Sequence, residues 1–158
     1  MHDRNARISE LYAASKERIL LLDGAWGVML QKMGLGEKDY RNEHFNADTY
    51  PGQMKGNNDI LCLTRPDCVT QLLGSYYDAG ADISETNTFS STSIALDDCH
   101  LTLKDVIDIY HAGARLARLA AGHWNEMTPD THLFSAGSFC PLHKMLSISS
   151  HANEPVGR

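Results

Sequence analysis

The chain has 158 residues, of which 42% are hydrophobic and 22% are charged, a composition typical of one folded domain rather than of a disordered segment. Its net charge of -6 leaves no cationic footprint for nucleic acid or for an anionic membrane surface. Apolar runs are only a few residues long, and charges stand where a signal peptide would have its apolar centre, so we predict a cytoplasmic protein that binds neither nucleic acid nor membrane.

The first elements in chain order are a helix, a strand and a second helix. Residues 1–17 are expected to form a helical N-terminal extension ahead of a domain over 18–158. The short apolar run at 19–22, closed by Asp23-Gly24, favours a buried strand. A helix is predicted over 25–34, and the polar, aperiodic stretch 35–58 is expected to be a loop that covers a site.

The remaining elements repeat the alternation of strand and helix. Strands are predicted at 59–63 and 132–138, and residues 81–89 are predicted to form a strand with its outgoing loop. Thr64, with Pro66 in the first turn, is expected to cap a helix that ends at Gly80. Thr102 is expected to cap a helix that runs to about Gly122. The predicted apolar stripe of that helix consists of Leu103, Val106, Ile107, Tyr110, Ala114 and Ala117.

This alternation predicts an α/β protein with parallel strands joined by helical crossovers. Both a doubly wound sheet and part of a (β/α)8 barrel fit the pattern. In either architecture the functional groups lie at the carboxyl ends of the strands.

Polar clusters follow three of the predicted strands. They are Asp23-Gly24, Glu85-Thr86-Asn87-Thr88 and Gly137-Ser138. Backbone N–H groups at Gly24 and Ser138 could bind a carboxylate while Asp23 and Glu85 bind an ammonium group, so the set suits an amino-acid zwitterion. Each cluster also has a structural interpretation, as a turn or as hydrogen-bonding groups that join neighbouring loops.

No catalytic residue and no metal ligand is assigned from the sequence. GxSxG, GxGxxG, GxxxxGK[ST] and HExxH motifs are absent. Cys62, Cys68, Cys99 and Cys140 are scattered without zinc-site spacing, so we expect them to be buried or half-buried thiols.

Four sequence blocks carry a resemblance to a known family. In chain order they are "LLDGAWGVMLQ", "FNADTYPGQMKGNNDILCLTRPDCV", "YYDAGADISETNTFSSTSIA" and "AGSFCPLHKMLSISS". Together they resemble the amino-terminal homocysteine-binding module of the cobalamin-dependent methionine synthases, which belong with the homocysteine S-methyltransferases. Betaine- and S-methylmethionine-homocysteine methyltransferases share the Asp-Gly corner but look less like this chain around "ETNTF".

The resemblance implies the first half of a (β/α)8 TIM-type barrel that binds homocysteine through the clusters named above. In the full enzyme, zinc held by three cysteine thiolates activates the homocysteine thiol. Methylcobalamin, recharged from 5-methyltetrahydrofolate, supplies the methyl group, and folate, cobalamin and activation domains act as partners. The product is methionine.

This chain departs from the family pattern at several positions, and these departures limit the function that we expect of it. No cysteine of this chain matches a zinc ligand, and Trp26 and Val28 replace the usual Met and Thr of the Asp-Gly motif. We therefore expect a partial homocysteine-binding domain that stops before the zinc-ligand region and is inactive alone. The alternative from another class is a non-catalytic α/β interaction protein.

Overall fold

Three short extended segments lie side by side in chain order in the computed structural model, which describes residues 4–96, 99–128 and 131–139. Strands β1 (Ile83–Glu85) and β2 (Phe134–Ala136) pair in parallel, with Ile83 opposite Phe134 and Glu85 opposite Ala136. Leu22 makes one parallel bridge to Ile83. The predicted parallel α/β arrangement is thus confirmed, although the first strand is reduced to this bridge and the other two to three residues each.

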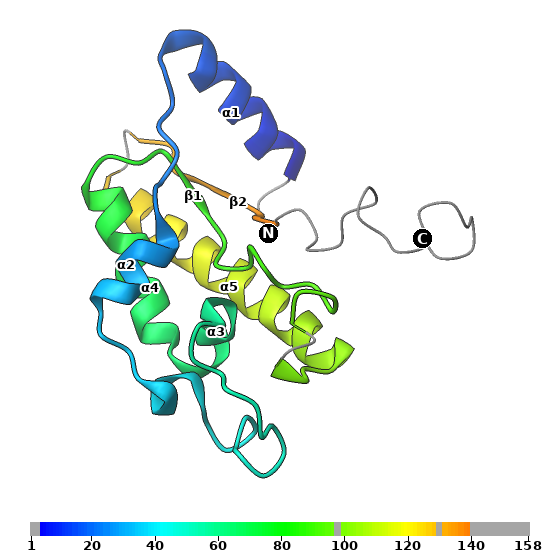
Figure 1. The fold of residues 1–158 in the computed structure, drawn as a ribbon. Coiled ribbons are helices and arrows are strands. Elements are labelled where there is room, and N and C mark those ends of the chain that lie inside the picture. Colours follow the sequence, from blue (N-terminus) through cyan, green and yellow to red (C-terminus); the bar gives the residue numbers. More distant parts are fainter. Residues whose placement is uncertain (1–3, 97–98, 129–130, 140–158) are drawn as a thin grey trace, which may run out of the picture.

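The described part of the chain has five α-helices, of which α4 and α5 pack against the strands (Figure 1). They are α1 (Arg4–Glu17), α2 (Trp26–Lys32), α3 (Leu61–Thr64), α4 (Pro66–Asp78) and α5 (Leu103–Met127). Single 3-10 turns occupy Glu37–Tyr40 and Asn58–Ile60. Helix α5 is the crossover between β1 and β2, and no described helix is long and apolar enough to span a membrane.

The ends of α4 and α5 follow from local chemistry. Thr102 caps α5 as predicted: its side chain accepts a hydrogen bond from the Asp105 N–H, and the Asp105 carboxylate accepts from the Thr102 N–H in return. Gly80 follows the end of α4 with a φ of +95°, a left-handed conformation that glycine adopts without strain. Helix α5 continues to Met127, beyond the predicted end.

The predicted strand at 59–63 is wrong, because this stretch is helical and belongs to the 3-10 turn and α3. Ile60, Leu61 and Cys62 are all buried against the core, and a short apolar run of this kind does not distinguish a buried strand from a buried helix. Thr64 is also not the cap of α4. Arg65 occupies that position with an extended φ of -139°, as expected for the residue before a proline.

The predicted apolar stripe of α5 is wrong for most of its members. Leu103, Ile107 and Tyr110 lie toward solvent, with exposures of 66%, 45% and 36%. The face that α5 turns inward is built mainly from smaller side chains, which allow close approach of the neighbouring segments. It consists of Val106, Ile109, Gly113, Ala117, Ala120 and Ala121.

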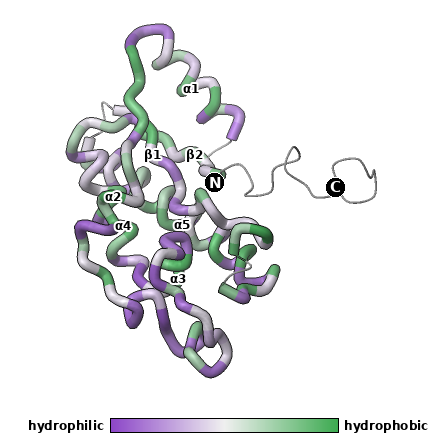
Figure 2. Tube along the Cα trace, in the orientation of Figure 1, coloured by the Kyte–Doolittle hydropathy of each residue, from purple (hydrophilic) through white to green (hydrophobic). Residues whose placement is uncertain are grey.

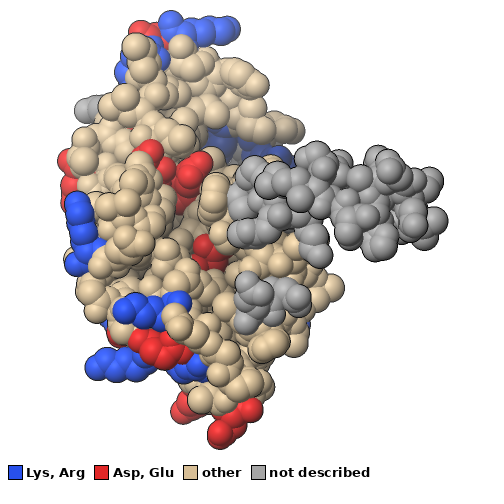
Figure 3. All heavy atoms as spheres, viewed as in Figure 1, with Lys and Arg blue, Asp and Glu red and all other residues tan. Residues whose placement is uncertain are grey.

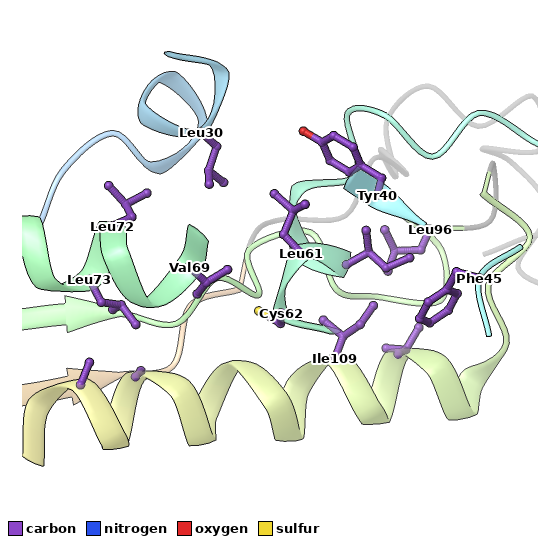
Figure 4. Packing of buried hydrophobic residues seen from close by; sticks show 14 of the residues in the cluster. Leu30, Tyr40, Phe45, Leu61, Cys62, Val69, Leu72, Leu73, Leu96 and Ile109 are labelled. Atoms are coloured by element: carbon purple, nitrogen blue, oxygen red, sulfur yellow. The ribbon is translucent and has the colours of Figure 1, made fainter. Parts of the chain in front are cut away.

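The hydrophobic core lies between α5 and the elements packed over it (Figure 4). Leu72 and Leu73 of α4, Leu61 of α3 and Leu30 of α2 converge there above Ile109 of α5. The long segment 35–58 also enters this core, through Tyr40, Phe45, Tyr50 and Met54. It is therefore an anchored connection, and only its last residues reach the cavity described below.

Helix α1 stands at one end of the molecule, and the extended stretch that follows it is apolar (Figures 1 and 2). Arg18 fixes this stretch through a bidentate ion pair with Asp82, the residue before β1, at 2.6 and 2.8 Å. Ile19 nevertheless remains 85% exposed, and Leu21 and Leu22 are 56% and 54% exposed. This edge of the described sheet is an open apolar surface.

Candidate functional site

A cavity of about 530 Å³ opens at the carboxyl ends of the parallel segments. Its wall comes from Gly24 and helix α2, the segment before α3, the loop after β1, and Ser138 beyond β2. In the space-filling view, acidic side chains lie in the hollowed middle of this face (Figure 3). The cavity is therefore where the alternation of strand and helix predicted a site.

Asp23 is not itself part of the cavity wall but lies next to it, because Gly24, Trp26 and Glu85 line the cavity and the last two hydrogen-bond one oxygen of Asp23. Oδ2 accepts from the Trp26 indole at 2.9 Å and from the Glu85 N–H at 2.8 Å. Oδ1 is buried and has no hydrogen-bond partner among the described residues. Burial raises the pKa of Asp23, and the two hydrogen bonds oppose that rise. The carboxylate thus keeps one acceptor oxygen unused.

Gly24, Glu85 and Ser138 all line the cavity, but of the two predicted backbone donors only the one at Gly24 is free among the described residues. The Ser138 N–H donates to the Thr86 hydroxyl at 2.9 Å, so the predicted free donor at Ser138 is wrong. The Gly24 N–H makes no hydrogen bond within the described part of the chain. Ser138 Oγ donates to Glu85 Oε2 at 3.4 Å.

Residues Thr86 to Thr88 mainly make hydrogen bonds that join neighbouring loops. The Thr88 hydroxyl donates to the Ser138 carbonyl at 2.8 Å and lies 2.7 Å from the Thr86 hydroxyl, and the Asn87 amide donates to the Asn58 carbonyl at 2.7 Å. Thr86 and Asn87 line the cavity, whereas Thr88 and Gly137 are not part of its wall. The structural interpretation therefore accounts for Thr88.

Sequence reasoning missed the wall contributed by Asn57, Asn58 and Asp59. Asp59 is buried, and its Oδ2 accepts from the Ser90 N–H and the Ser91 hydroxyl, both at 2.7 Å. Burial raises its pKa to about 6, against the effect of those hydrogen bonds. The polar run "NND" immediately before the apolar residues 60–63 was the available signal, because buried polar side chains need partners or ligands.

The described residues do not fit a zinc site. No group of three His, Cys, Asp or Glu side chains with metal-binding geometry occurs among them. Cys62 is buried and donates to the Asn87 carbonyl, and burial raises its pKa to about 12, which disfavours the thiolate. Cys68 is buried and Cys99 half-buried, as expected, while Cys140 lies outside the described residues.

Comparison with known proteins decides the family of this chain. The sequence model of homocysteine S-methyltransferases matches residues 20–157. The chain belongs to the homocysteine S-methyltransferase family. The Asp23-Gly24 corner, the loop after β1 and the residues after β2 all fall inside the matched range.

Two solved structures of the homocysteine methyltransferase MmuM from Escherichia coli share this family member's fold. The oxidized form superposes with a TM-score of 0.58 at 24% identity, over 78% of this chain and 37% of MmuM. The metallated form gives a TM-score of 0.66 at 22% identity, over 89% of this chain and 44% of MmuM. The chain therefore spans less than half the length of MmuM and shares its α/β fold.

Proposed function

We propose that this chain forms the amino-acid-binding part of a homocysteine S-methyltransferase and that homocysteine binds in the cavity beside Asp23. The unused Oδ1 of Asp23 is the observation that carries the proposal, because an isolated buried acceptor next to a cavity suits an ammonium group. Glu85 would add a second negative charge, and the Gly24 N–H would donate to the carboxylate.

The methyl transfer itself would need groups that the described residues do not supply. The family resemblance implies a zinc thiolate site that activates the homocysteine sulfur, and the described cysteines do not form one. Within the proposal, the chain corresponds to the first half of a (β/α)8 barrel, and its own residues bind and orient the amino acid. The overlap with less than half of MmuM supports this view.

Within this family we favour a cobalamin-dependent methionine synthase, with methylcobalamin as donor, 5-methyltetrahydrofolate as its source, and folate, cobalamin and activation domains as partners. The "KGNNDIL" and "ETNTF" blocks support this choice over a betaine- or S-methylmethionine-dependent enzyme. We expect the isolated chain to form no methionine from homocysteine and methylcobalamin above the rate without enzyme. Turnover above that rate would contradict the half-barrel proposal.

The binding proposal is tested by titrating homocysteine calorimetrically into the chain, with and without zinc. Asp23→Asn should weaken binding about tenfold or more, because a charge-assisted hydrogen bond to the ammonium is lost. Asp48→Asn is the matched control, since Asp48 is exposed and, among the described residues, its carboxylate makes no hydrogen bond to the cavity wall, unlike that of Asp23. Equal affinity of the Asp23 variant and the unchanged chain would refute the assignment.

A second candidate is a non-catalytic interaction protein that pairs its open sheet edge with another chain. The exposure of Ile19, Leu21 and Leu22 favours it, because an apolar edge of this kind is a template for strand pairing. Zinc-independent self-association without homocysteine binding, measured by sedimentation alongside the titration, would support this candidate over the first.

A further inference from the structure

The carboxamide of Asn57 is unsatisfied in the cavity wall. Both its oxygen and its nitrogen are buried, and neither has a hydrogen-bond partner within the described ranges. Asn57 also lines the cavity. A native protein seldom buries both a donor and an acceptor without partners, because each loses its hydrogen bonds to water on folding. The Asn57 side chain therefore calls for an explanation other than stability.

The backbone around Asn57 is well fixed, so the unsatisfied side chain is not a sign of a loosely held segment. The Asn57 N–H donates to the Met54 carbonyl at 3.0 Å. The Glu37 carboxylate accepts from the N–H groups of Met54 and Lys55, at 3.0 and 2.7 Å. The neighbouring Asn58 has its partner, the Tyr40 hydroxyl, at 3.1 Å. Within this described segment, the Asn57 carboxamide is left without a partner, and a rotation of the side chain would redirect it.

The charges and donors of the cavity indicate what this carboxamide would meet. With the Ser138 N–H engaged by Thr86, the Gly24 N–H is left as one donor for a ligand carboxylate, which accepts several hydrogen bonds. The acidic groups of the wall, Asp59 and Glu85, repel a carboxylate, whereas Lys55 attracts it. Lys55 lies two positions before Asn57 in the sequence.

The segment of Asn57 also approaches the Asp-Gly corner. A Cβ placed on Gly27, in the first turn of α2, would stand 4.0 Å from the Asn58 amide nitrogen. Gly24, Gly27, Lys55 and Asn57 all belong to the wall of one cavity. Donors from the two segments can therefore converge on one small anionic group.

We propose that the Asn57 carboxamide is a ligand-binding group that turns into the occupied cavity and donates through Nδ2 to the carboxylate of the amino-acid ligand. This inference rests on the proposed function and deepens it, because it assigns the carboxylate end of the same site. This arrangement lowers the stability of the ligand-free protein, because the Asn57 carboxamide stays buried there without partners. The residue thus trades stability for binding.

The test combines thermal unfolding with calorimetric titration of three ligands: homocysteine, 4-mercaptobutanoate, which lacks the amino group, and 3-aminopropane-1-thiol, which lacks the carboxylate. Asn57→Leu should raise the Tm by about 2–6 °C, since two unsatisfied polar atoms are removed. Asn58→Leu, the matched neighbour, should lower the Tm because it breaks the bond to Tyr40. Asn57→Ala serves in place of Asn57→Leu if the leucine variant does not fold.

The pattern of affinities decides the outcome. Asn57→Leu should weaken homocysteine and 4-mercaptobutanoate about 10- to 100-fold and leave 3-aminopropane-1-thiol unchanged. Unchanged homocysteine affinity, or an equal loss for all three ligands, would overturn the role of Asn57 while leaving the proposed function intact. Absence of homocysteine binding to the unsubstituted chain would overturn both.

Discussion

Substitution of Gly113 in α5 tests how tightly this helix supports the loop after β1. A Cβ at Gly113 would lie 2.6 Å from the Thr88 methyl group and 3.5 Å from Cys62 Sγ. Ordinary carbon contacts begin near 3.4 Å, so the Thr88 side chain would have to move by about 0.8 Å. Thr88 is not free to turn aside, because its hydroxyl is bonded to Ser138 and Thr86.

The expected change in the free energy of unfolding caused by Gly113→Ala is the sum of two opposing effects. Glycine to alanine within a helix gains up to about 1 kcal/mol in helix propensity. The clash costs about 1–3 kcal/mol in overpacking, and up to about 1 kcal/mol more if a Thr88 hydrogen bond breaks. We expect Gly113→Ala to be destabilised by about 1–3 kcal/mol, which lowers the Tm by about 3–10 °C.

Gly122 provides a matched control on the same helix. A Cβ there would meet no atom within 4 Å, so Gly122→Ala should gain stability by about 0.5–1 kcal/mol. Urea unfolding of both variants, followed by circular dichroism, measures the difference directly. Equal stabilisation of the two would show that α5 does not press on Thr88 and would refute the reasoning.

Three further predictions concern carboxylates. Burial alone would raise the pKa of Asp105, but hydrogen bonds from His44, Thr102 and Tyr50 outweigh it and hold the pKa at about 2. Because this value lies below the unfolded value of about 3.9, about 2 kcal/mol of stability present above pH 4 should be lost as the pH falls toward 2, and Tyr50→Phe should reduce this loss in urea titrations. Burial raises the pKa of Asp59 to about 6, so the folded chain holds a proton that the unfolded chain releases. The free energy of unfolding should therefore fall by about 3 kcal/mol as the pH rises from about 4 to about 6. The same fall in the Asp59→Asn variant would contradict this prediction. Trp26→Phe removes a hydrogen bond that lowers the pKa of Asp23, so carbon NMR should find that pKa raised, whereas Trp124→Phe, whose indole bonds Asp78, should leave it unchanged.

The alternation of apolar runs and helical patterns was enough to predict that the strands are parallel and that the cavity lies at their carboxyl ends. The cap at Thr102 and the stop at Gly80 were predicted correctly, whereas the cap at Thr64 was not. The spacing of apolar residues gave wrong predictions where tertiary packing decides the structure. The run at 59–63 became helical because its residues fill the core beneath α4, and α5 turned its small residues inward because neighbouring segments approach it closely.

The candidate site was predicted in part, for a related reason. Asp23, Gly24 and Glu85 follow strands in the sequence, and the structure brings them to one cavity wall or its edge. Whether a backbone donor such as Ser138 N–H is available depends on a partner fifty-two residues away, and no local pattern reveals that. Asn57 escaped notice because it lies at the end of the stretch interpreted as a loop, and Asp59 because it was interpreted as the first residue of a strand.

The hydrogen bonds that join Thr86, Thr88 and Ser138 have a consequence for the order in which the parts of this structure can form. The loop after β1 is synthesised about fifty residues before the segment that fixes it. During translation, α2, α3 and α4 can pack on one another early, but the wall of the cavity on the side of β2 closes only when residue 138 has left the ribosome. A nascent chain would thus gain its core first and its affinity for a small molecule last.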